Sequence, residues 1–226
     1  MLPAAERRIA AELAPDALVL DVGGWAKPLA RADWVIDLLP YETRGLYGPE
    51  RREPERFGAA TWVERDICAT EPWPFPDGRF DFAVCAHTLE DVRDPVRVCE
   101  ELVRVARAGY VEVPAPVEEL TFGVQGPWVG WSHHHWISEM APAPAHGLRF
   151  TFKPHLLGAP GRHLPAGSCD GLAPEDRVLA LWWNGSFTFG EQVLVGAEAF
   201  DPWLEGLLAC QRSDHPATRT RRRFRR

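Results

Sequence analysis

Short, mostly apolar runs recur along the first half of the chain and are separated by polar or turn-forming segments. These runs lie at residues 18–20, 34–36, 61–64, 80–86 and 110–113. Runs of this length, bounded by glycine, proline or aspartate, are typical of buried strands. The pattern therefore predicts five strands before residue 114.

Helical periodicity is clearest in residues 94–107, DPVRVCEELVRVAR. Asp94 is a good N-cap, and Pro95 is tolerated at the first helical position. An apolar face recurs at helical spacing, formed by Val96, Cys99, Leu102, Val103 and Ala106. Residues 1–17 predict a short amphipathic helix, and residues 200–210 a final apolar helix. Strands that alternate with helices indicate a parallel sheet with right-handed crossovers.

The alternation stops after Pro116. Residues 117–147 are rich in Trp, His, Gly and Pro, and two strand-like runs follow at 148–153 and 178–189. The second run contains the turn signal Asn184-Gly185, which predicts an antiparallel hairpin at the end of the fold.

Composition and charge exclude several classes of protein. The chain has 46% hydrophobic and 25% charged residues, which is ordinary for a globular protein. Its net charge of −7 argues against a general binder of nucleic acid or membrane surfaces. No apolar run approaches the ~20 residues of a membrane span. The first residues carry acids and lack the apolar core of a signal peptide, so we expect a cytoplasmic location.

Two further features of the composition bear on possible sites. The five cysteines are scattered without CxxC spacing, so neither a disulfide framework nor a thiolate zinc site is expected. Six arginines fall within residues 219–226. We expect a disordered, solvated tail there, and the alternative is a segment that binds RNA or phosphates.

Residues 18–37, LVLDVGGWAKPLARADWVID, form a strand–turn–strand pattern with an acid at the end of each strand. Gly23 and Gly24 in the turn allow a ligand to approach the backbone closely. Asp37, 16 residues after Asp21, suits the acid that binds two ribose hydroxyls. This layout is typical of an α/β nucleotide-binding half.

Four segments in order extend this pattern: LVLDVGG, WVID, ERDICATEPWPFPDGRFDFAVCAHTLEDVRDP and EELVRVARAGYVEVP. Together they resemble the class I S-adenosylmethionine-dependent methyltransferases that act on small molecules. FPDGRFDFAVCAHTLEDVRDP is the most specific piece. The resemblance implies an α/β, Rossmann-like doubly wound sheet, mostly parallel with a C-terminal antiparallel hairpin, in three α/β/α layers. It implies one domain over residues 1–218, with a Trp/His-rich insertion at about 115–147, and S-adenosyl-L-methionine as cofactor.

The resemblance also assigns cofactor-binding roles. Asp21, Gly23 and Gly24 would lie under the methionine and sugar parts, and Asp37 would bind the ribose hydroxyls. Asp66 would meet the adenine amino group, Ile67 would pack on the ring, and His87 would lie near the methionine moiety. Two departures stand out: residues 25–28 are Trp-Ala-Lys-Pro where the family has a third small residue, and Asp91 follows Leu89-Glu90 where many relatives have His.

The segment WVGWSHHHW, residues 128–136, has three interpretations. In the first, His133 or His135 acts as general base or substrate anchor, with Trp131, His134 and Trp136 lining the substrate site. In the second, His133 and His135 share one face of an extended segment and bind a metal. That site would be completed by Glu139, His146, His155 or His163. In the third, the histidines anchor a Trp-rich lid. We adopt the first and assign no metal ligand.

The sequence therefore predicts a methyltransferase that acts on an O or N atom of a small-molecule acceptor, without membrane association and with no nucleic-acid partner unless the arginine tail supplies one. One alternative is an enzyme of this fold repurposed as a metal-dependent or non-methylating lyase or cyclase. The other is a non-catalytic binding module. Glu112, in a buried strand, is either ion-paired or an acid of the pocket.

Overall fold

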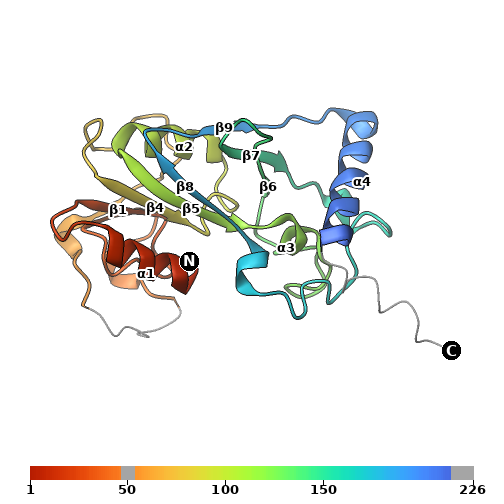
Figure 1. The fold of residues 1–226 in the computed structure, drawn as a ribbon, viewed down its shortest axis with the longest axis horizontal. Helices are drawn as coiled ribbons and strands as arrows, with labels where there is room; N and C mark the ends of the chain where they lie inside the picture. The colour runs from red at the N-terminus through yellow and green to blue at the C-terminus, as the bar shows by residue number, and fades with distance from the viewer. Residues whose placement is uncertain (47–53, 215–226) are drawn as a thin grey trace.

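The computed structural model describes residues 1–46 and 54–214, and it is built on a six-stranded sheet (Figure 1). The strand order is β3-β2-β1-β4-β5-β8. The first five strands run parallel, and β8 runs antiparallel to β5. The mostly parallel α/β sheet is thus confirmed. Its strands are β1 (Val19–Val22), β2 (Trp34–Asp37), β3 (Trp62–Glu64), β4 (Phe82–Ala86), β5 (Ala108–Pro114) and β8 (Val178–Asn184).

Helices cover the two faces of this sheet. Side chains alternate between faces along a strand, so Val19 of β1 packs with Ile9 of α1 (Pro3–Glu12). Leu20, the next residue, packs with Leu102 of α2 (Pro95–Val105) on the other face. These contacts make the α/β/α layers that the sequence predicts.

Helix α2 buries most of the face that its apolar pattern predicts, with Cys99, Leu102 and Ala106 in the core. Val98 and Val105 are fully buried, whereas Val96 and Val103 are only half-buried. Glu101 is buried on the same side of the helix, where it accepts a hydrogen bond from the backbone N–H of Trp73 at 2.6 Å. Arg104 pairs with the Glu101 carboxylate at 2.6 Å, so the buried charge is compensated. The predicted N-cap is confirmed, because the Asp94 side chain accepts from the N–H of Arg97 at 2.9 Å.

The predicted C-terminal hairpin is wrong, because its two strands belong to different sheets. After β8 the chain turns at Gly185 and forms β9 (Thr188–Glu191), which pairs in parallel with β7 (Gly147–Phe152). β7 pairs on its other side with β6 (Trp136–Met140), a strand that the sequence pattern did not reveal. The pairing depends on Gly147, where any Cβ would overlap the backbone of Thr188.

The last helix, α4 (Gly196–Asp214), is longer than expected and packs on the short helix α3 (Pro116–Leu120). Phe200, Leu204 and Leu208 of α4 share a buried cluster with Val117 and Leu120 of α3. None of the helices in the described part of the chain is long and apolar enough to cross a membrane. The arginine-rich residues 219–226 lie outside the described residues.

Gly147→Ala tests the β7–β9 pairing. The added methyl group meets backbone rather than a movable side chain, so we expect a loss of about 1–3 kcal/mol in the free energy of unfolding. Gly190→Ala is the matched control, because a Cβ there has open space. Urea denaturation of both variants provides the measurement, and equal stability of the two would contradict the pairing.

Candidate functional site

The carboxyl ends of β1 and β4 meet around a glycine turn. Gly23 has a φ of +72°, which favours glycine, and its N–H donates to the carbonyl of Ile36 at 2.9 Å. Any Cβ on Gly23 would collide with the side chain of Thr88, just beyond β4. The buried carboxylate of Asp21 accepts from the N–H of Leu29 at 2.6 Å, and a Cβ on Gly24 would collide with it. The turn therefore needs both glycines that the sequence analysis singled out.

Asp37 stands at the end of β2 with both carboxylate oxygens engaged by backbone. Oδ2 accepts from the N–H of Trp25 and Oδ1 from that of Leu39, each at 2.9 Å. Burial raises the pKa of Asp37, and these backbone N–H groups oppose the rise. The unusual Trp25 loop thus folds onto the predicted ribose acid. Leu38 beside it is 63% exposed, an apolar surface that the sequence analysis did not single out.

Asp66 and Ile67 follow β3 and differ in exposure. Asp66 is ion-paired with Arg93 at 2.6 Å. Partial burial opposes ionisation, but the Arg93 guanidinium holds the pKa of Asp66 below its usual range. Ile67 is buried in the main hydrophobic cluster, where its carbonyl accepts from the indole N–H of Trp73 at 3.0 Å.

His87, directly after β4, is the single non-glycine residue with positive φ among those described, at 54°. Its Nε2 lies 2.9 Å from Glu112 and its Nδ1 3.4 Å from Glu90. Burial alone would lower the pKa of His87, but these carboxylates raise it to about 9. Glu112 also accepts hydrogen bonds from the Tyr110 hydroxyl and, at 2.9 Å, from the N–H of Leu2. Of the two interpretations of Glu112, the structure shows the ion-paired one.

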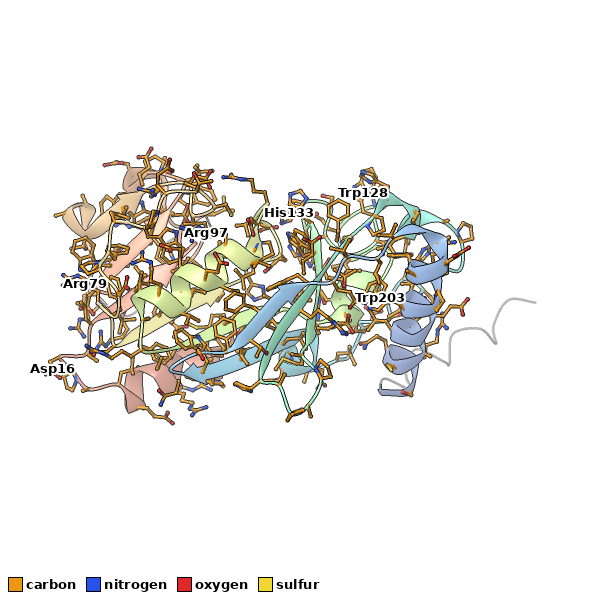
Figure 2. All side chains as sticks on the ribbon, turned by 90° about the horizontal axis from the view of Figure 1, so that it is seen from above. Asp16, Arg79, Arg97, Trp128, His133 and Trp203 are labelled. Carbon is orange, nitrogen blue, oxygen red and sulfur yellow. The ribbon has the colours of Figure 1, made fainter. Side chains whose placement is uncertain are left out.

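The Trp/His-rich segment docks on the loop that follows β4. The N–H of His135 donates to the carbonyl of Glu90 at 2.7 Å, and the indole N–H of Trp136 donates to the carbonyl of Val92 at 2.8 Å. Trp136 is 7% exposed and belongs to the core, so its ring anchors the segment. Figure 2 shows His133 about midway along the molecule, between α2 and α4.

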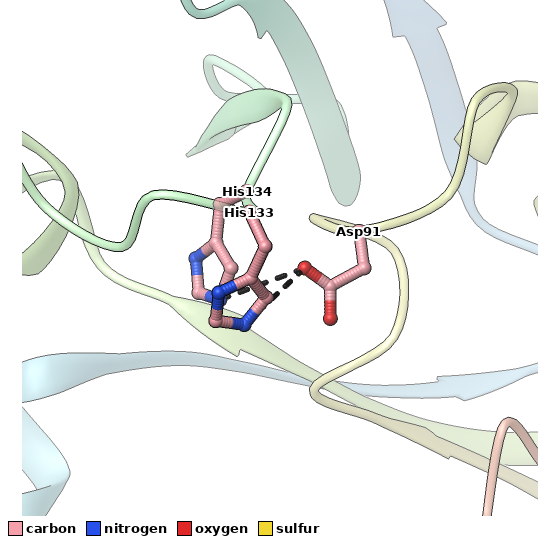
Figure 3. A group of neighbouring side chains, drawn as sticks. All are labelled: Asp91, His133 and His134. Atoms are coloured by element: carbon pink, nitrogen blue, oxygen red, sulfur yellow. Dashed lines mark ion pairs between the residues drawn. The ribbon is translucent and has the colours of Figure 1, made fainter. Parts of the chain in front are cut away.

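Docking brings Asp91, His133 and His134 together, and we call these three residues the Asp–His group (Figure 3). Asp91 Oδ1 lies 3.9 Å from His133 Nε2 and 3.7 Å from His134 Nε2. The expectation that His133 pairs with His135 is wrong, because the chain turns at Ser132 and His133 instead of staying extended. The Ser132 N–H and hydroxyl hold this turn by donating to Gln125 Oε1 at 3.1 and 2.9 Å.

A buried carboxylate fixes the orientation of His134. Nδ1 of His134 is hydrogen-bonded to Glu119, which is fully buried and also pairs with Lys153 at 2.7 Å. Since Glu119 and Lys153 form an ion pair, the carboxylate accepts and His134 Nδ1 donates. Nε2 then faces Asp91, whose Oδ1 lies 3.7 Å away. Trp131 stacks on the imidazole, with ring centroids 5.7 Å apart and an interplanar angle of 23°.

Partial burial shifts the pKa values of two members of the Asp–His group, His133 and Asp91. Burial lowers the pKa of His133, and neighbouring His134 lowers it further. Burial raises the pKa of Asp91 to about 7, with Glu90 and Glu119 adding to the rise and His134 opposing it. His133 is therefore neutral at pH 7 and able to accept a proton.

The other residues considered for this site have different partners or lie apart from it. His135 is exposed, and within the described ranges it is not among the side chains that gather at Asp91. His146 and His163 are hydrogen-bonded to the carbonyls of Trp182 and Leu157, at 2.7 and 2.8 Å. Glu139 is bound by Arg149 at 3.2 Å and Trp203 at 2.9 Å, and His155 is exposed.

The His87–Glu112 pair predicts a pH dependence of stability. The pKa of His87 rises from 6.5 to about 9 on folding, so its contribution is complete below pH 6.5 and is lost as pH rises through 9. The pKa of Glu112 falls from 4.5 to about 2, so its contribution is present above pH 4.5 and is lost towards pH 2. His87→Asn removes the charge while tolerating the positive φ.

We expect the stability advantage of the wild type over His87→Asn to shrink by about 1 kcal/mol between pH 6.5 and pH 9, since solvent screens the half-exposed imidazole. Chemical denaturation at the two pH values measures it. A difference between the proteins that does not change with pH would show that the ion pair contributes nothing.

Part of the chain is similar to known proteins. Residues 42–111 match a family model described as a methyltransferase domain. No curated protein matches the chain. Among solved structures, a putative methyltransferase from Bacillus halodurans is 21% identical over 50% of this chain and 51% of its own, with a TM-score of 0.36.

Two further solved structures match the chain with similar TM-scores. An S-adenosylmethionine-dependent methyltransferase from Mesorhizobium loti is 15% identical over 68% of this chain and 64% of its own, with a TM-score of 0.39. A second such enzyme, from Aquifex aeolicus, is 21% identical over 48% and 62%, with a TM-score of 0.33. The chain spans about half the length of several of the structures it matches. At these levels the structural likenesses carry no argument about function.

The family match falls within the strand-loop-strand region whose residues carried the resemblance in the sequence. Residues 42–111 run from the loop after β2 into β5, and they include His87 and Asp91. Over these residues the chain is similar to methyltransferase domains, in line with the resemblance that its sequence motifs carry.

Proposed function

We propose that this protein transfers a methyl group from S-adenosylmethionine to an oxygen or nitrogen atom of a small-molecule acceptor. The observation that carries the proposal is the short path from the glycine turn to the Asp–His group. The Thr88 side chain packs on Gly23, with its hydroxyl 3.4 Å from the Gly23 carbonyl oxygen. The N–H of Asp91 in turn donates to the Thr88 carbonyl at 3.1 Å. A group that can remove a proton therefore adjoins the turn at which the family binds its cofactor.

The residues around this turn fit the cofactor. The Asp37 carboxylate, held in place by backbone N–H groups, would accept from the ribose, and exposed Leu38 offers an apolar surface for the adenine. Glu90 Oε2 is buried and has no hydrogen-bond partner in the described part of the chain. That orphan oxygen suits a cationic donor such as an ammonium group. Asp21 and Gly23 would hold the methionine and sugar parts.

When bound, S-adenosylmethionine supplies an electrophilic methyl group, so the protein has to orient the acceptor and remove its proton. His133 is exposed and neutral at pH 7, and its Nε2 would take the proton from the acceptor hydroxyl or amine. His134, fixed by Glu119, would position the acceptor. Trp131, stacked on His134, would form one wall of the acceptor site.

Asp37→Asn tests the cofactor site. The amide replaces one acceptor oxygen by a donor, so it keeps the size of the side chain but loses part of the ribose recognition. We expect calorimetric titration with S-adenosylhomocysteine to show micromolar binding to the wild type. Binding to the variant should be at least ~10-fold weaker, which corresponds to a loss of about 1.4 kcal/mol in binding free energy. Asp16→Asn, on the surface before β1, is the control. A well-folded wild type that does not bind would contradict the proposal.

His133→Ala tests the assignment of the base. Loss of a general base costs about 10²–10⁴-fold in turnover, and since His133 does not contact the cofactor residues, S-adenosylhomocysteine affinity should stay unchanged. Turnover is measured by methyl transfer to a panel of hydroxyl and amine acceptors. His155→Ala, an exposed histidine elsewhere, serves as control. Equal loss of turnover and of cofactor affinity in His133→Ala would remove the assignment.

A further inference from the structure

We propose that the Asp–His group binds a divalent first-row transition metal through Asp91 Oδ1, His133 Nε2 and His134 Nε2. These three donor atoms all lie within 4.8 Å of one another. Figure 3 shows the two imidazoles side by side with the carboxylate facing them. Two imidazoles and a carboxylate are a common three-ligand set for Zn²⁺, and they are also the set that holds non-haem Fe²⁺.

The spacing of the donors is close to that of a loaded site. Metal–ligand bonds of about 2.0–2.1 Å in tetrahedral geometry separate neighbouring donors by roughly 3.3 Å. The two Asp91–histidine separations are 3.9 and 3.7 Å. His133 is 52% exposed and Asp91 40% exposed, so small side-chain rotations close the difference.

His134 has the outer partners of a metal ligand. Metal-binding histidines commonly donate their second ring N–H to a carboxylate, which fixes the ring and makes the ligating nitrogen more basic. Glu119 does this for His134, and Lys153 holds Glu119 in turn. The ring nitrogens of His146 and His163 contact only backbone carbonyls in the described hydrogen bonds.

The metal would change how the acceptor is activated, and this consequence rests on the proposed function. Three protein ligands leave at least one open position. An acceptor hydroxyl bound there would lose its proton more readily, because a bound metal lowers the pKa of a coordinated oxygen. In the loaded protein the metal then takes the part assigned to His133. Loss of turnover in His133→Ala fits both cases, so metal binding itself has to be measured.

The test is titration of the chelator-treated full chain with Co²⁺, followed by absorption spectroscopy and then by displacement with Zn²⁺. Asp91→Asn and His133→Gln remove exposed ligands, so neither is expected to impair folding. His135→Gln is the matched control, because it removes an exposed imidazole of the same segment that is not in the group. Each preparation is also titrated with S-adenosylhomocysteine, so that failure of the metal site is distinguished from failure of the cofactor site.

We expect one equivalent of Co²⁺ with a visible d–d band in the wild type and in His135→Gln. Asp91→Asn and His133→Gln should weaken binding by more than the 10–100-fold that is typical for loss of an outer partner, and Glu119→Gln should fall within that range. The proposal is overturned if the wild type binds no metal while S-adenosylhomocysteine still binds. Binding that survives in both ligand variants also overturns it, because the metal then lies elsewhere, for example at exposed Cys210. Elemental analysis of protein purified without chelator distinguishes zinc from iron.

Discussion

The site depends on the two hydrogen bonds by which the Trp/His-rich segment docks on the loop after β4. The N–H of His135 donates to the Glu90 carbonyl, and the indole of Trp136 donates to the Val92 carbonyl. These bonds seat the segment on either side of Asp91, and the turn at Ser132 then directs two imidazoles to it. Without this docking the histidines would lie on an insertion far along the chain from the glycine turn. The insertion thus contributes the two imidazoles, and the loop after β4 of the parallel sheet contributes Asp91.

Buried carboxylates are concentrated around the same place, and each has a cationic or hydrogen-bonding partner. Glu112 is paired with His87, Glu119 with His134 and Lys153, and Glu118 with Arg177 at 2.7 Å. Buried ion pairs seldom add much net stability, but removal of one partner is costly. Here these pairs fix the orientation of two histidine side chains. One is His87, directly after β4, and the other is His134, in the Trp/His-rich segment. Glu90, next to Asp91 in the sequence, has one buried oxygen, Oε2, without a hydrogen-bond partner in the described part of the chain.

Short sequence patterns predicted the strands and the helix whose formation depends on neighbouring residues in the chain. The strands around Asp21 and Asp37 and the helix capped by Asp94 follow from apolar runs, glycine turns and capping residues. The pairing of β9 with β7 depends on a contact between Gly147 and Thr188, distant in sequence, and no short pattern encodes it. In the site, the glycine turn and the position of Asp37 at the end of β2 could be predicted because they depend on local spacing. The partnership of His133 with His134 was missed because a two-residue turn reverses the alternation expected of an extended segment. The engagement of Asp37 by the Trp25 loop was likewise invisible until the backbone was placed.

We propose that the glycine turn and the Asp–His group form one site. A crystal structure of the protein with S-adenosylhomocysteine would show whether they do. We expect the ribose at Asp37 and the homocysteine part beside Gly23 and His87. The sulfur atom should face Asp91 and the two histidines across a gap wide enough for a small acceptor. A nucleoside bound away from Asp37, or a sulfur atom turned away from the Asp–His group, would contradict it.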